Sequence, residues 1–161
     1  MLDYIIRPLK KEEVYLLETF LYEAIFQRPG VEKLPEYVIH EPEIWVYIDS
    51  FGKDTDHCLV AEYRSEIVGA VWTRILGGAV SGFGHLDNQT PEFALSVLED
   101  FRGQGIGKSL MERMVKDLKE LGFSQASLAV QKDNYAVRLY QQVGFQIIDE
   151  NEEEFIMLCK L

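Results

Sequence analysis

"FRGQGIGKS", residues 101–109, joins a strand-like run to the most regular helix-like run of the chain. It places Gly103, Gly105 and Gly107 around the start of that helix. The first N–H groups of a helix have no intrahelical acceptor, and the helix dipole is positive at that end. Because glycine lets a bulky anion approach the backbone closely, the stretch predicts a phosphate-binding turn.

Two widespread phosphate motifs do not fit this turn. A P-loop, Gly-x-x-x-x-Gly-Lys-Ser/Thr, would need glycine at the position of Arg102, which argues against an NTP-dependent kinase. A dinucleotide fingerprint, Gly-x-Gly-x-x-Gly, would need glycine in place of Lys108 or Leu110. What remains is Arg-x-x-Gly-x-Gly, at Arg102, Gly105 and Gly107. On these residues alone, a tight strand-to-helix turn without a ligand stays open.

The rest of the chain predicts one mixed domain over residues 1–161, with a central sheet covered by helices. Apolar spacing favours helices over 10–26, 42–52, 106–122 and 134–144, the last with Asn134 as its N-cap. Apolar runs predict strands over 3–9, 57–63, 66–75, 92–98, 126–130, 145–150 and 155–161, with a hairpin turn at Arg64–Ser65.

Composition limits the classes of function. Sixteen basic and 27 acidic residues give a net charge of −11, which disfavours nucleic acid as a partner and mildly favours a cationic ligand. No apolar run reaches the ~20 residues that a membrane helix needs, and no signal peptide is evident, so a cytoplasmic location is expected. Cys58 and Cys159 lie in apolar runs without metal-site spacing, so we expect buried thiols and no metal.

Two longer stretches carry a family resemblance. "ALSVLEDFRGQGIGKSLM" (94–111) resembles the acetyl-CoA motif of the GCN5-related N-acetyltransferases, the GNAT superfamily, with Val97 five residues before Arg102. "DNYAVRLYQQVGF" (133–145) resembles the second signature of that family, although Asp133 stands where many members have the asparagine and Asn134 follows one residue later. The resemblance implies an α/β (α+β) fold: a mixed, mostly antiparallel sheet of six to seven strands with about four helices.

The resemblance also implies acetyl-CoA as cosubstrate. Its pyrophosphate would sit on the backbone N–H groups of residues 102–107, so an acidic protein could bind an anion through amides. The pantetheine arm would pair with the backbone of Leu95, Ser96 and Val97, and an N–H near Val97 or Leu98 would polarise the acetyl carbonyl. The expected cofactor-binding residues are Leu95, Ser96, Val97, Leu98, Arg102, Gly103, Gln104, Gly105, Ile106, Gly107, Lys108, Asn134 and Tyr140.

The implied activity is acetyl transfer to a primary amine by direct attack in a ternary complex. A lysine-like amine with a pKa of ~10.4 is mostly protonated at neutral pH, so a general base is expected. Glu92 is the first choice for that base, with Asp87 and His85 as weaker ones. Tyr140 matches the family tyrosine that protonates the leaving thiolate; the other interpretations are a packing residue or a cofactor contact.

The acceptor is expected on the side of the sheet that the N-terminal third covers. Aromatic and acidic residues between 30 and 60 would suit a cationic small molecule or a protein amine; they are Tyr37, Trp45 and Tyr47 together with Glu32, Glu36, Glu41, Glu43, Asp49, Asp54 and Asp56. A CoA-binding sensor or interaction module with little catalysis is the second hypothesis. The apolar "FIMLCKL" (155–161) would also allow a homodimer through the C-terminal strands.

Overall fold

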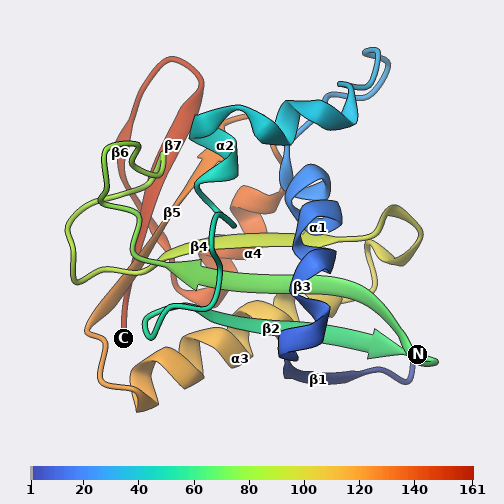
Figure 1. The fold of residues 1–161 in the computed structure, drawn as a ribbon. Coiled ribbons are helices and arrows are strands. Elements are labelled where there is room, and N and C mark those ends of the chain that lie inside the picture. Colours follow the sequence, from blue (N-terminus) through green and yellow to red (C-terminus); the bar gives the residue numbers. More distant parts are fainter. Residues whose placement is uncertain (1) are drawn as a thin grey trace.

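A single mixed sheet of seven strands organises the protein, whose computed structural model describes residues 2–161. The strand order across the sheet is β1-β2-β3-β4-β5-β7-β6 (Figure 1). Neighbouring strands are antiparallel, except for β4 and β5, which run parallel. The strands are β1 (Ile5–Pro8), β2 (His57–Tyr63), β3 (Glu66–Arg74), β4 (Glu92–Val97), β5 (Gln125–Gln131), β6 (Gln146–Glu150) and β7 (Glu154–Lys160).

Helices cover both faces of the sheet. On one face a 3-10 turn (Lys11–Leu16) leads into α1 (Leu17–Ala24), and a second 3-10 turn (Glu36–His40) precedes the short α2 (Pro42–Trp45). The other face carries α3 (Ile106–Glu120) and α4 (Ala136–Val143). Separate apolar clusters fill the two layers: Phe20 and Trp72 lie in the α1 layer, and Leu110 and Phe145 lie in the α3 layer. The predicted fold class is therefore confirmed.

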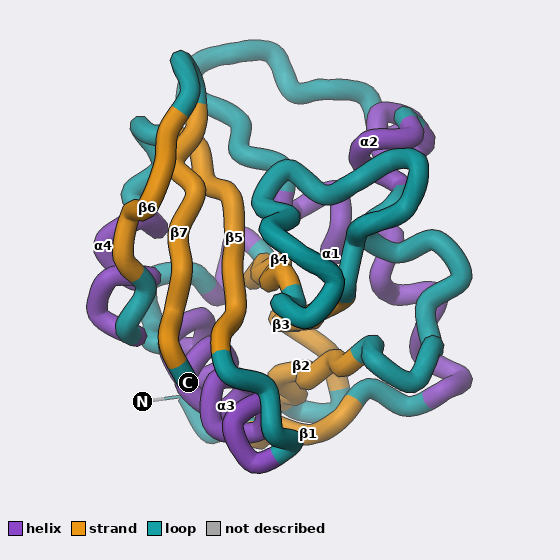
Figure 2. Tube along the Cα trace, turned by 90° about the vertical axis from the view of Figure 1, so that its left-hand side faces the viewer, coloured by secondary structure: helices purple, strands orange, loops and turns teal. Residues whose placement is uncertain are grey.

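Two neighbouring strands of the sheet, β4 and β5, separate from each other along most of their length. β4 and β5 share only the register pair Glu92 and Ser127, and their backbones separate beyond it. Figure 2 shows β5, β7 and β6 running steeply past the edge of the first four strands. The edge of β4 that faces β5 therefore lacks a strand partner over most of its length.

The predicted elements match those observed except in the N-terminal third. The helix expected over 42–52 ends at Trp45 and continues only as turns. Its next carbonyls are used by distant side chains: Val46 O accepts from Arg74 Nη1 at 2.9 Å, and Tyr47 O accepts from Trp72 Nε1 at 3.0 Å. These tertiary hydrogen bonds replace the i+4 bonds that a longer helix would need.

Residues 155–160 of the stretch 155–161, for which the sequence allowed a homodimer contact, belong to an inner strand of the sheet. β7 lies between β5 and β6, so both of its edges are already paired within the chain. The edge strand is β6, which is exposed throughout and carries Asp149 and Glu150 beside Ile147 and Ile148. At this end of the sheet, edge-to-edge pairing between two copies would use β6, and a dimer through the C-terminal strands stays a prediction.

Candidate active site

The glycine turn presents a row of free amides at the start of α3. Gly103 and Gly105 have positive φ angles of 76° and 84°, and Gly105 is the N-cap of the helix. Within residues 2–161, the N–H groups from Gly103 to Lys108 have no hydrogen-bond acceptor, and the first amide that does is Ser109, bonded to Gly105 O at 3.1 Å. A Cβ built on Gly103 or Gly105 would meet nothing within 4 Å. This cradle has the donors and the open space that a pyrophosphate needs.

The side chains of the turn contribute less than the sequence suggested. Arg102 donates from Nε to Val97 O at 2.8 Å and forms an ion pair with Glu23 at 3.1 Å, so its guanidinium ties the turn to β4 and α1. Its N–H is also used, by Glu99 O. Ser109 Oγ accepts from the hydroxyl of Tyr4 at 2.9 Å. The anion-binding capacity of the turn therefore lies in the backbone from Gly103 onward.

The expected pantetheine strand is β4, but only alternate residues face the gap. Leu98 N–H donates to Val68 O at 2.9 Å, so this amide is bound within the protein and cannot serve as an oxyanion donor. Since donors alternate along an antiparallel pair, Ser96 also points its backbone at β3, while Leu95 and Val97 point theirs at the gap. The Ser96 hydroxyl binds Phe20 O at 2.7 Å and anchors α1. Leu95 and Val97 therefore remain as candidates.

A cavity of about 360 Å³ lies between the diverging strands and brings both expected catalytic residues together. Its walls come from β4 (Glu92 to Leu95), β5 (Leu128 to Gln131), α1, α4 and the loop before β4. Glu92, Asn134 and Tyr140 all line it. Glu92 thus meets two residues of a much later segment of the chain, Asn134 and Tyr140, where the sheet opens.

Glu92 is a buried carboxylate with incomplete hydrogen bonding. Its exposed fraction is 2%, and its Oε2 accepts from Gly84 N–H at 3.0 Å and from the hydroxyl of Tyr47. Oε1 has no partner within residues 2–161. Burial raises the pKa of Glu92 to about 7, helped by the nearby Glu154 carboxylate, while the two hydrogen bonds act in the opposite direction. A carboxyl with this pKa exchanges protons readily at neutral pH.

Tyr140 faces the same cavity from α4. Its ring packs edge-on against Phe145, with centroids 6.3 Å apart, and its hydroxyl has no hydrogen-bond partner among the described residues. Burial raises the pKa of Tyr140 to about 12, so the phenol keeps its proton at neutral pH. Asn134 uses its side-chain oxygen to accept from Ala136 N–H at 2.9 Å, as an N-terminal cap would, and its amide nitrogen stays available.

Most of the residues that the sequence suggested for acceptor binding do not line this cavity. None of the seven carboxylates between residues 30 and 60, all of them in the described part of the chain, lines the cavity. Asp56 instead forms a buried pair with Arg74 at 3.0 Å. Tyr37 is 75% exposed, and Trp45 packs against His40. Tyr47 alone of these ten residues lines the cavity.

The acidic lining comes from residues that sequence reasoning missed. Glu153 and Glu154, at the turn into β7, line the cavity together with Glu92, and no Lys, Arg or His does so within residues 2–161. Their position opposite β4 follows from the pairing of β7 with β5, which no local pattern reveals. The only available signal was the run of acids over 149–154.

The weaker base candidates do not reach the cavity. Asp87 is exposed, and the N–H of Gln89 together with Thr90 lowers its pKa, so it is an ordinary loop carboxylate. The imidazole of His85 packs against Gly77, and His85 does not line the cavity. Glu92 is therefore the carboxylate that geometry favours.

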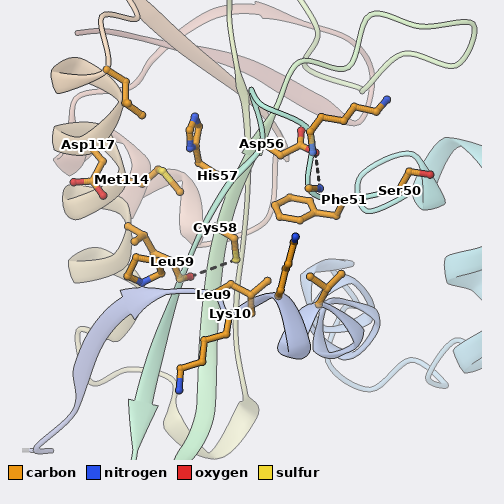
Figure 3. Close-up of a pocket in the computed structure, with 16 residues that line it drawn as sticks. Leu9, Lys10, Ser50, Phe51, Asp56, His57, Cys58, Leu59, Met114 and Asp117 are labelled. Atoms are coloured by element: carbon orange, nitrogen blue, oxygen red, sulfur yellow. Dashed lines mark hydrogen bonds between the residues drawn. The ribbon is translucent and has the colours of Figure 1, made fainter.

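A larger cavity, about 680 Å³, lies at the other end of the sheet beside β1 and the C-terminal end of α3 (Figure 3). Its two carboxylates are already paired, Asp56 with Arg74 and Asp117 with Arg113. Burial raises the pKa of Cys58, so this thiol stays protonated. Neither the free amides at the glycine turn nor Tyr140 is near it, so size alone does not identify the site.

Comparison with known proteins agrees with this geometry. The family model described as "Acetyltransferase (GNAT) family" matches residues 17–145. An acetyltransferase of Pectobacterium atrosepticum is 37% identical over 97 residues, which are 60% of this chain and 62% of that protein. The chain therefore matches less than two thirds of the length of that relative.

Solved structures share the fold across the whole chain. The PaiA N-acetyltransferase of Thermoplasma acidophilum, in complex with coenzyme A, has a TM-score of 0.71 at 20% identity and covers 99% of this chain and 100% of its own. YncA of Salmonella typhimurium, a putative acetyltransferase with acetyl-CoA, has a TM-score of 0.72 at 15% identity, covering 99% and 94%. Within residues 2–161, no helix combines the length and apolarity needed to cross a membrane.

Proposed function

The chain belongs to the GNAT family of acetyltransferases, and from this premise we propose that it transfers the acetyl group of acetyl-CoA to a primary amine. The cosubstrate is the one that the family uses. The single observation that carries the proposal is that a buried carboxylate, Glu92, and a protonated phenol, Tyr140, line one cavity in a chain whose glycine turn leaves a row of backbone amides free.

Each step has a residue suited to it. Acetyl-CoA supplies an activated acyl carbon on a thiol leaving group. The N–H groups from Gly103 to Lys108 hold the pyrophosphate, and Leu95 and Val97 hold the pantetheine arm. Glu92 accepts the proton that the neutral amine loses as its nitrogen lone pair attacks the acyl carbon, and Tyr140 gives its proton to the departing thiolate. A carbon–nitrogen bond forms as the carbon–sulfur bond breaks, and the products are an amide and coenzyme A.

A cationic acceptor is favoured by the charges around the cavity. Glu92, Glu153 and Glu154 line it, and no Lys, Arg or His among residues 2–161 does, so an ammonium group would gain attraction on entry. Transfer to nitrogen agrees with the structural neighbour from Thermoplasma acidophilum, which is an N-acetyltransferase. The apolar wall formed by Ile25, Phe26 and Phe83 would accommodate the carbon chain of such an amine.

Thiol release from acetyl-CoA, measured against a panel of mono- and dicationic amines, tests the proposal. In Glu92→Gln, turnover at pH 7 should fall by about 100-fold or more, while acetyl-CoA affinity by calorimetry stays unchanged. Asp87→Asn is the matched control and should turn over like the unaltered protein. Binding of acetyl-CoA without acetylation of any amine would instead identify a sensor, and full turnover in Glu92→Gln would remove its role as base.

A further inference from the structure

Tyr47 contacts the expected base more closely than any other side chain does. It follows α2, and its hydroxyl donates to Glu92 Oε2 while it accepts the N–H of Phe83 at 2.9 Å. Its ring stacks on that of Phe83, with centroids 6.3 Å apart. Its carbonyl is fixed by the indole N–H of Trp72, which is 1% exposed. Two hydrogen bonds therefore fix the hydroxyl, and the ring and the carbonyl of Tyr47 are fixed by separate contacts.

We propose that Tyr47 is the positioning residue for Glu92, holding the carboxylate in one orientation and stabilising its ionised form. The inference rests on the proposed function, since it assigns Tyr47 a role only through the base. Tyr47 need not touch the reacting atoms. The role comes from a hydrogen bond to the charged form of a group that burial pushes toward its neutral form.

No other side chain can supply this stabilisation. Glu92 receives hydrogen bonds from Tyr47 and from the amide of Gly84, and within residues 2–161 its remaining oxygen has no donor. Arg74 is its cross-strand neighbour, but Asp56 and the carbonyl of Val46 occupy the guanidinium.

The remaining groups around Glu92 do not help. Glu154, from β7, opposes ionisation of Glu92, and Glu153 and Tyr140 line the same cavity without bonding to it. Burial and the Glu92 charge raise the pKa of Tyr47 well above its usual value, so the phenol stays protonated and remains a donor. Within residues 2–161, Tyr47 therefore supplies the one side-chain donor to Glu92.

The same hydroxyl also holds the loop that supplies the second donor. Phe83 N–H binds Tyr47, and the next amide, Gly84 N–H, binds Glu92. Gly84 O accepts a hydrogen bond from Ser127 Oγ at 2.7 Å. Loss of the Tyr47 hydroxyl removes one hydrogen bond to Glu92 directly and frees the N–H beside the other. The two donors to the base therefore depend on one residue.

The test is the pH profile of turnover in Tyr47→Phe. The loss of a donor to the carboxylate should raise the pKa of Glu92, so the acid limb of the profile should move up by about one pH unit. Activity should partly recover at pH values above the shifted limb. Replacing Tyr47 with 3-fluorotyrosine, whose hydroxyl is a stronger donor, should move the limb down. Tyr37→Phe, at an exposed tyrosine of the same segment, should leave the profile unchanged. The KM for acetyl-CoA should not change in any of the three.

A merely structural role would lower activity equally at every pH and leave the limb in place, and that outcome would overturn the proposal. The fluorinated protein keeps its ring and hydroxyl, so its opposite shift remains measurable even if Tyr47→Phe is unstable. Tyr47→Phe should add little to Glu92→Gln, because both act through one group. If Glu92→Gln is inactive and Tyr47→Phe keeps a normal profile, only the positioning role fails. If Glu92→Gln is fully active, the assignment of the base fails first.

Discussion

Replacing Gly82 with alanine should disable the base without touching the cosubstrate site. A Cβ at Gly82 would lie 2.1 Å from Glu92 Oε1 and 2.9 Å from both Glu92 Cδ and Leu76 Cδ1. Since carbon and oxygen atoms rarely approach below ~3.3 Å, the carboxylate must withdraw by roughly 1 Å. A displacement of that size at a reacting group costs on the order of 100-fold in rate, so we expect kcat to fall by about that factor.

The assay is thiol release with saturating amine, combined with calorimetry of acetyl-CoA binding. Affinity for acetyl-CoA should be unchanged, because Gly82 lies outside the glycine turn and β4. Gly78→Ala is the matched control: it changes the same loop, where a Cβ would meet nothing within 4 Å. Overpacking costs about 1–3 kcal/mol, so both variants should be assayed well below their Tm. A folded Gly82→Ala protein with normal kcat would refute the assigned position or role of Glu92.

Three further changes test other parts of the structure. Tyr140→Phe should lower kcat by about 10-fold or more with little change in the Kd of acetyl-CoA, as stopped-flow and calorimetry would measure; equal loss of affinity would indicate a binding role instead. Gly105→Glu should abolish acetyl-CoA binding in calorimetry, because a carboxylate and a Cβ at φ 84° would meet the pyrophosphate; retained affinity would place the anion elsewhere. Asp56→Asn should lower the free energy of unfolding by about 3 kcal/mol in urea titrations, because it leaves buried Arg74 unpaired. Hydrogen bonds from Arg74 and from the Gly52 and Lys53 amides lower the pKa of Asp56 in the folded protein. The ionised Asp56 therefore adds to the free energy of unfolding above the unfolded pKa of ~3.9, and this stabilisation is lost as the pH falls below that value. A loss unaffected by pH would contradict this account.

The strand, turn and helix start that we propose for cofactor binding could be predicted because they are nearly continuous in sequence. β4, the glycine turn and the start of α3 occupy residues 92–111, and the free amides follow from local rules for helix starts and positive φ angles. Tyr140 and Asn134 belong to a second continuous stretch. Local rules failed where a side chain had a better partner elsewhere, as when Arg102 bound Val97 O and Glu23.

The acceptor half could not be predicted, because pairing between distant segments creates it. Nothing near Glu92 in sequence indicates that Tyr47 reaches it from 45 residues away. Glu154 reaches the cavity because β7 inserts between β5 and β6, an order that the alternation of residues does not encode. The acids between residues 30 and 60 therefore led to the correct prediction of an acidic cavity. The prediction was made from the wrong residues, because none of these acids lines the cavity.

Acceptor choice could change within this fold without a change in the segment proposed for cofactor binding. The amides that we propose for acetyl-CoA binding belong to the backbone, so side-chain substitutions at 103–108 should alter them little unless a Cβ blocks the cradle. The acceptor wall instead depends on single side chains from three segments: Tyr47 after α2, Phe83 in the loop, and Glu154 on β7. Of these, Tyr47 bonds directly to the base, and the backbone N–H of Phe83 donates to the Tyr47 hydroxyl. Substitutions that widen this wall should therefore change the pH dependence of turnover as well as the acceptor, whereas substitutions at Glu153, which has no bond to Glu92, should change acceptor affinity alone.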